Sequence, residues 1–160
     1  MVHKFIVCDP DLCTGCQTCE FACSAAKEGV FDPLHSRIRH VRIEPATALA
    51  VACRLCEDAP CVTACPRRAL TRDATSGLIR VDNDRCDGCA WCIEACEFGA
   101  IALDANRKRV FICDRCDGKD EPECVAMCPK GALSVSTPEL VAQKTRRKVV
   151  AKLLAELAER

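Results

Sequence analysis

Large aromatic side chains are scarce in this sequence, which has no tyrosine, one tryptophan and five phenylalanines among 160 residues. A hydrophobic core usually relies on such side chains, because each one buries a large apolar area. A surplus of one charge is also missing, since 23 basic side chains balance 23 acidic ones. The composition therefore gives no signal for binding nucleic acid or an anionic membrane. The 49% of apolar residues nevertheless argues against disorder.

Long hydrophobic segments are missing as well. The best apolar run, residues 46–53, is less than half of the ~20 residues that a membrane-spanning helix needs. The opening residues, MVHKFIVC, contain no extended apolar stretch and no small-residue cleavage site, so we expect no signal peptide. These absences predict a chain without a membrane span in the reducing cytoplasm, where thiols bind metals rather than form disulfides.

Signatures of catalysis are also lacking. The sequence has no phosphate-binding glycine loop, no dinucleotide fingerprint and no Ser/His/Asp arrangement in a recognisable motif. Asp9, Asp11, Asp82 and Asp84 stand just before cysteine-rich segments, where turn and cap roles are favoured over a carboxylate site. We therefore predict that the chain is not itself an enzyme.

What the sequence has in excess is cysteine, at 17 of 160 residues. Sixteen of them fall into four groups of four, and Cys8 stands outside. The groups are Cys13, Cys16, Cys19 and Cys23; Cys53, Cys56, Cys61 and Cys65; Cys86, Cys89, Cys92 and Cys96; and Cys113, Cys116, Cys124 and Cys128. The first and third groups have the spacing CxxCxxCxxxC. The second and fourth keep both ends of that spacing but lengthen the middle gap.

This spacing is typical of iron–sulfur ligands. In bacterial ferredoxins three closely spaced cysteines bind one [4Fe–4S] cluster, and the fourth ligates the neighbouring cluster. A zinc site would need two CxxC pairs or a Cys/His mixture, and only three histidines exist. The pattern predicts four [4Fe–4S] clusters, with a structural zinc-binding module as a weaker alternative. Cys8 ends an apolar segment that predicts a strand, and we expect a buried small side chain there rather than a ligand.

An internal repeat sets the expected fold. An Asp-x-Asp-x-Cys approach precedes groups one and three, and a Gly or Pro exit follows groups two, three and four. Short strands are predicted at residues 69–72, 78–81, 100–103, 110–112 and 132–135, with hairpin turns at 73–77 and 104–108. The sequence thus predicts an α+β chain made of tandem bacterial-type 2[4Fe–4S] ferredoxin folds over residues 1–136.

Two further segments have a different character. Residues 37–43 form a basic, partly alternating stretch that predicts a charge-protected edge strand, or a docking surface for an acidic partner. His35 and His40 are expected at the surface rather than among the ligands. From Thr137, a capping signal and apolar residues at helical spacing predict a helical extension over residues 137–160. This helix could pack on the core, serve as an arm for a partner subunit, or join two copies of the chain.

The four cysteine groups together resemble those of the four-cluster iron–sulfur subunit family. That family includes the electron-transfer subunits of dimethyl sulfoxide reductase and formate dehydrogenase, and compact members in aldehyde oxidoreductases, carbon monoxide dehydrogenase and formate hydrogenlyase. The resemblance covers residues 7–136. It implies that groups one and four form one half of the domain and groups two and three form the other.

The resemblance also implies the ligands of each cluster. The four sets are Cys13, Cys16, Cys19 and Cys128; Cys113, Cys116, Cys124 and Cys23; Cys53, Cys56, Cys61 and Cys96; and Cys86, Cys89, Cys92 and Cys65. Some relatives carry a tryptophan in place of a group-three cysteine, but here Trp91 lies between intact Cys89 and Cys92.

The function expected from these ligand sets is electron transfer. The resemblance to the compact family members implies a large pterin- or nickel-containing catalytic subunit as one partner, with a tungsten or molybdenum aldehyde oxidoreductase favoured. A further electron carrier or flavin subunit is expected as the other partner. The alternative is a free-standing polyferredoxin that shuttles between enzymes.

Overall fold

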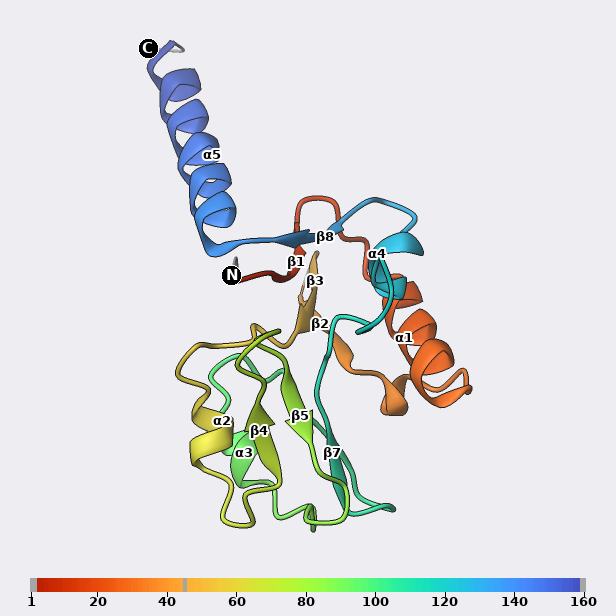
Figure 1. Ribbon diagram of the computed structural model, residues 1–160. Helices are drawn as coiled ribbons and strands as arrows, with labels where there is room; N and C mark the ends of the chain where they lie inside the picture. The colour runs from red at the N-terminus through yellow and green to blue at the C-terminus, as the bar shows by residue number, and fades with distance from the viewer. Residues whose placement is uncertain (1–2, 45, 159–160) are drawn as a thin grey trace.

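The computed structural model describes residues 3–44 and 46–158, and within them every strand belongs to a two-stranded antiparallel sheet (Figure 1). Two of these sheets are the hairpins that the sequence predicts, and they pair β4 (Leu70–Arg72) with β5 (Ile79–Val81) and β6 (Ala102–Asp104) with β7 (Arg109–Phe111). A third sheet pairs β1 (Phe5–Cys8) with β8 (Leu133–Ser136), and here the sequence predicts both strands but not their pairing. The predicted turn at residues 73–77 is present, because the Asp73 carboxylate accepts hydrogen bonds from the backbone N–H groups of Thr75 and Ser76.

The fourth sheet pairs β2 (Ile38–Ile43) with β3 (Thr47–Ala52), in a register from Ile38 opposite Ala52 to Ile43 opposite Thr47. β2 confirms the strand predicted in the basic segment. β3 was not predicted, because three of its six residues are alanine, which has little preference for strands. Pairing with β2 and burial of alternate side chains override that weak local preference.

A helix begins within each cysteine group. These helices are α1 (Thr18–Glu28), α2 (Pro60–Thr63), α3 (Trp91–Glu94) and α4 (Glu123–Ala126), and a 3₁₀ turn, η1 (Pro33–His35), follows α1. The third cysteine of every group is the second residue of its helix. α1 packs against α4, and α2 packs against α3. The short strands and helices make the α+β, tandem ferredoxin-type fold that the sequence predicts.

The core between these elements is built largely from small side chains. Phe5, Ile38, Leu55 and Leu78 are the large apolar residues that are almost completely buried. Seven cysteines lie in the buried core beside them: Cys23, Cys53, Cys61, Cys92, Cys113, Cys116 and Cys124. Thiols thus occupy interior positions that aromatic side chains would fill in a chain of ordinary composition.

The last helix, α5 (Pro138–Ala158), projects away from the rest of the molecule (Figure 1). Its start confirms the predicted cap, since the Leu140 N–H donates to Thr137 Oγ1 at 3.3 Å. The alternative in which this helix packs on the core is wrong, because none of its residues is buried and Leu153 and Leu154 are 52% and 61% exposed. Residues 159 and 160 of the predicted extension lie outside the described residues. In the part of the chain that the structure describes, no helix is long and apolar enough to cross a membrane.

Candidate iron–sulfur sites

The four cysteine loops share one backbone conformation. The third residue of the first CxxC unit in each group has a left-handed φ: 69° at Gly15, 53° at Leu55, 72° at Gly88 and 55° at Arg115. Such a φ costs a non-glycine residue about 1 kcal/mol or more, so two loops tolerate a strain that glycine relieves in the other two. At Leu55 and Arg115 the turn directs the backbone N–H to the sulfur two residues earlier, with N–Sγ distances of 3.4 Å in both loops.

The backbone that follows the last cysteine of a group also repeats. Three residues after the last cysteine, φ is 50° at Arg68, 59° at Gly99 and 58° at Gly131. After groups two and three, the next backbone N–H donates to the sulfur of that last cysteine. This confirms the internal repeat for groups two, three and four. Group one differs because α1 continues past Cys23, whose sulfur instead accepts from the Arg37 N–H at 3.3 Å.

One cavity collects thiols from groups one and four. Its walls include Cys13, Cys16, Cys19 and Cys128, and Cys8 lines it as well. Burial raises the pKa of Cys19 to about 12, whereas hydrogen bonds from Thr18 lower the pKa of Cys16. Burial also raises the pKa of Cys8 to about 11, and the nearby thiols of Cys13 and Cys128 raise it further.

A second cavity collects thiols from groups two and three. Cys53, Cys56, Cys61 and Cys96 line it, together with Arg54 and Phe98. Burial raises the pKa of Cys53 to about 12, and the other three thiols of the cavity add to the effect. Four thiols around one space are the donor set that an iron–sulfur cluster needs.

The remaining cysteines also find neighbours outside their own group. Burial raises the pKa of Cys92 to about 11, and neighbouring thiols that raise it further include Cys86 and Cys65. Burial raises the pKa of Cys124 too, with contributions from Cys113, Cys116, Cys23 and Cys19. In residues 3–44 and 46–158, no three Cys, His, Asp or Glu side chains converge on one point as a single metal ion would require.

His40 is the site residue that sequence reasoning missed. It lines the cavity that holds Cys13 and Cys16, its Nε2 is buried, and this nitrogen has no hydrogen-bond partner among the described residues. The expectation of a surface histidine is therefore wrong for His40. The two-residue period of a strand could have indicated that His40 points inward. Residues two apart lie on the same face, and His40 stands two residues after the fully buried Ile38. His35 is three-quarters buried as well, and its Nδ1 lies 3.0 Å from Asp32 Oδ2.

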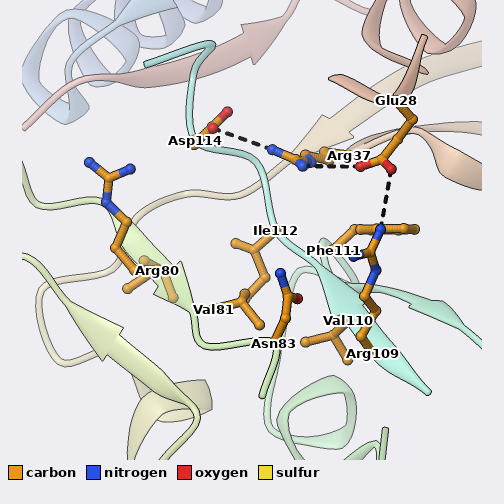
Figure 2. Close-up of a pocket in the computed structure, with 11 residues that line it drawn as sticks. Glu28, Arg37, Arg80, Val81, Asn83, Arg109, Val110, Phe111, Ile112 and Asp114 are labelled. Carbon is orange, nitrogen blue, oxygen red and sulfur yellow. Dashed lines mark hydrogen bonds and ion pairs between the residues drawn. The ribbon is translucent and has the colours of Figure 1, made fainter. Parts of the chain in front are cut away.

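An ion-pair network lies between group one, group four and the β6–β7 hairpin (Figure 2). The Arg37 guanidinium lies between Asp114 and Glu28, 3.3 Å from an oxygen of each, and Arg109 reaches Glu28 at 3.2 Å. Asp114 also accepts the Cys116 N–H at 3.1 Å. The network thus touches the backbone of one cysteine loop and, through the Arg37 N–H, the sulfur of Cys23.

Comparisons with known proteins find iron–sulfur relatives of this chain. The model of the 4Fe-4S dicluster domain family matches residues 46–137. The chain is 44% identical over 134 residues to the NADH-dependent phenylglyoxylate dehydrogenase subunit beta of Aromatoleum evansii, covering 82% of this chain and 30% of that one. It is 33% identical over 176 aligned positions to the electron transport protein HydN of Escherichia coli K12, covering 91% and 97% of the two chains.

A solved structure has a similar fold over the whole chain. A chain of the active site complex BamBC of benzoyl coenzyme A reductase, in complex with benzoyl-CoA, superposes with a TM-score of 0.51 at 21% identity. The match covers 100% of this chain and 99% of that one.

Proposed function

This chain belongs to the 4Fe-4S dicluster domain family, and from that premise we propose that it holds four [4Fe–4S] clusters and relays electrons between a catalytic subunit and a second redox partner. The chain is an iron–sulfur electron-transfer subunit of a kind associated with oxidoreductases. Four clusters would use sixteen of its seventeen cysteines.

The proposed ligands of each cluster are three cysteines from one group and the fourth cysteine of another. The sets are Cys13, Cys16, Cys19 and Cys128; Cys113, Cys116, Cys124 and Cys23; Cys53, Cys56, Cys61 and Cys96; and Cys86, Cys89, Cys92 and Cys65. The observation that carries the proposal is that two cavities are each lined by all four cysteines of one set. We also infer that groups one and four make one half of residues 1–136, and groups two and three the other half.

When bound, a [4Fe–4S] cluster supplies one-electron oxidation and reduction. The chain's own residues hold the ligating sulfurs in place, shield them from water and donate hydrogen bonds to them. Backbone N–H groups of Leu55, Ala69, Arg115 and Arg37 already point at cysteine sulfurs. Four cysteines per cluster would leave no iron position open to a substrate, so we propose that the chain is not catalytic.

We propose a large catalytic oxidoreductase subunit as the stable partner, of the tungsten- or molybdenum-pterin aldehyde oxidoreductase type. The relatives support the class of partner, since one of them is a subunit of a dehydrogenase. A flavin subunit or another electron carrier would take the second position. Free thiols in such numbers fit a reducing compartment, so we place the chain in the cytoplasm.

Metal analysis of anaerobically purified protein tests the clusters. We expect about sixteen irons and as many sulfides per chain, with a broad visible absorbance that dithionite bleaches. Cys96→Ala should reduce the content to about twelve irons, because it removes a ligand of one set. Glu97→Ala, one residue along, should leave the content unchanged. Zinc in place of iron, or an unchanged iron content in Cys96→Ala, would contradict the proposal.

Affinity isolation under anaerobic conditions tests the partner. A stoichiometric complex with a larger subunit that contains tungsten or molybdenum supports the proposed context. A complex with a nickel-containing subunit would keep the electron-transfer function but replace the catalytic partner. Recovery of the chain alone, still loaded with iron, favours the polyferredoxin shuttle instead.

A further inference from the structure

Cys8 is the one cysteine that the four proposed ligand sets do not use. It ends β1, where it lies opposite Leu133 of β8. The next residue continues the pairing, since the Asp9 N–H donates to the Ala132 carbonyl at 2.7 Å. The Cys8 backbone is therefore fixed by the strand pair that joins the two ends of the cysteine-rich region.

This strand pair brings Cys8 into the first thiol cavity. Cys8 and four proposed ligands line the same space, with Cys13 and Cys128 as its neighbouring thiols. The second thiol cavity is lined by four cysteines and has no fifth. The two cavities are otherwise alike, in that each draws three cysteines from one group and one from another. The extra thiol is thus a specific feature of the first cavity.

We propose that Cys8 is a reserve ligand of the first cavity, able to take the place of Cys13. The inference rests on the proposed function, which assigns this cavity to one [4Fe–4S] cluster. Two facts favour Cys13 as the ligand replaced. Cys13 is an immediate thiol neighbour of Cys8, and only four residues separate the two along a chain that the β1–β8 pair holds in place.

The exchange of Cys13 for Cys8 as a ligand would leave the charge and the oxidation state of the site unchanged. The Cys8 thiol loses one proton as its sulfur forms a bond to iron. The bond between that iron and the Cys13 sulfur breaks, and the released Cys13 thiolate takes up one proton. No oxidant or reductant is needed, because thiolate replaces thiolate.

Iron content of four variants of the whole chain, purified anaerobically, tests the inference. Wild type and Cys8→Ala should both hold about sixteen irons, because the resident ligands are complete. Cys13→Ala should also hold about sixteen, with Cys8 as the substitute. The double variant Cys8→Ala/Cys13→Ala should hold about twelve. Cys53→Ala is the matched control: it removes the equivalent cysteine of the cavity without a fifth thiol and should hold about twelve.

Alkylation provides a second readout. Native protein treated with iodoacetamide at about pH 10, where part of a thiol with a pKa of about 11 is ionised, and analysed by mass spectrometry should carry the label on Cys8 in wild type, whereas Cys8 should be protected in Cys13→Ala. The inference is overturned if Cys13→Ala loses about four irons, or if it yields no more folded protein than Cys53→Ala does. It is also overturned if Cys8→Ala alone loses iron, which would make Cys8 a resident ligand. A wild type without iron would instead defeat the proposed function itself.

Discussion

The Lys27 ammonium lies 2.7 Å from the Asp114 carboxylate, although 87 positions separate the two residues in the sequence. Lys27 stands in the last turn of α1, four residues after Cys23, and Asp114 directly follows Cys113. Both side chains are more than four-fifths buried. The pair therefore joins the end of group one to the start of group four, and Arg37 strengthens it by contacting the same carboxylate oxygen at 3.3 Å.

Replacing Lys27 should loosen this junction. Lys27→Met removes one cation from a largely buried network whose side chains still reach solvent, and we expect a loss of about 1–2 kcal/mol in the free energy of unfolding, between the values for exposed and fully buried pairs. For a chain of this size, that loss corresponds to a drop of roughly 3–6 °C in Tm, measured by anaerobic calorimetry on the iron-loaded protein. Lys119→Met is the control, because its pair with Glu123 is exposed and local. Equal Tm values for the two variants would show that the junction contributes nothing.

The Gly88 position should be intolerant of any side chain. A Cβ there would lie 2.9 Å from the Lys108 carbonyl carbon, in the turn of the β6–β7 hairpin, and φ is 72°. Gly131→Ala is the matched comparison, since φ is 58° and no atom lies within 4 Å of the added Cβ. Both variants carry the cost of a left-handed alanine, but only Gly88→Ala must also displace backbone, at about 2 kcal/mol more. We expect Gly88→Ala to melt roughly 4–8 °C below Gly131→Ala. A similar Tm for both would refute the close approach.

The protection of α5 against local opening should depend on Lys148. Its ammonium lies 3.1 Å from Asp9 and 2.8 Å from Asp11, and these are the ion pairs that tie the helix to the loop before group one. Since the hydrogen bond from Lys148 lowers the pKa of Asp9, the pair is fully formed at neutral pH and is lost only as acid protonates this carboxylate. Lys148→Ala should increase amide hydrogen exchange in residues 141–158 about two- to five-fold at neutral pH, because exposed pairs contribute up to about 1 kcal/mol.

A matched variant on the same helix checks this effect. Lys152 is paired only within α5, at 3.9 Å from Glu156, so Lys152→Ala should leave the exchange rates of the neighbouring turns almost unchanged. High salt should speed exchange in wild type and remove most of its difference from Lys148→Ala, since it screens the pairs. A salt-independent difference would point to the lysine's aliphatic chain instead.

His40 should raise the reduction potential of one cluster. His40 lines the first thiol cavity and its Nε2 is buried, so a hydrogen bond donated to the cluster proposed there would favour the more negative, reduced state. His40→Leu removes the donor and should lower one midpoint of the four by about 40 mV, the equivalent of a hydrogen bond of about 1 kcal/mol. His40→Gln keeps a donor and should largely restore the potential. Redox titration followed by electron paramagnetic resonance measures both, and His35→Gln, outside the cavity, should change nothing.

The parts of the fold that the sequence could predict are those with a strict local pattern. The Gly and Pro exits after Cys65, Cys96 and Cys128 predicted short strands, and β4, β6 and β8 are there. The Thr137 cap predicted where α5 begins. The cysteine spacing predicted four similar loops, and in the structure each loop has a residue with a left-handed backbone at the same position. In each case a few neighbouring residues determine the backbone, so no knowledge of distant contacts is needed.

The parts that escaped prediction depend on partners far along the chain. β3 is a strand because β2 lies beside it, and the inward position of His40 follows from the same pairing. The helical period of α5 predicted an apolar face but could not determine whether that face lies on the core. The positions of Leu55 and Arg115 gave no sign of a left-handed backbone, because neither residue favours it.

The pairing of β1 with β8 has a consequence for how the protein is made. Translation releases groups two and three as one continuous stretch, and α2 and α3 can pack as soon as that stretch has left the ribosome. Group one, although synthesised first, must wait for Leu133–Ser136 before its strand finds a partner. Groups two and three can thus fold while group one is still open, and the thiols of group one are enclosed after those of the two middle groups.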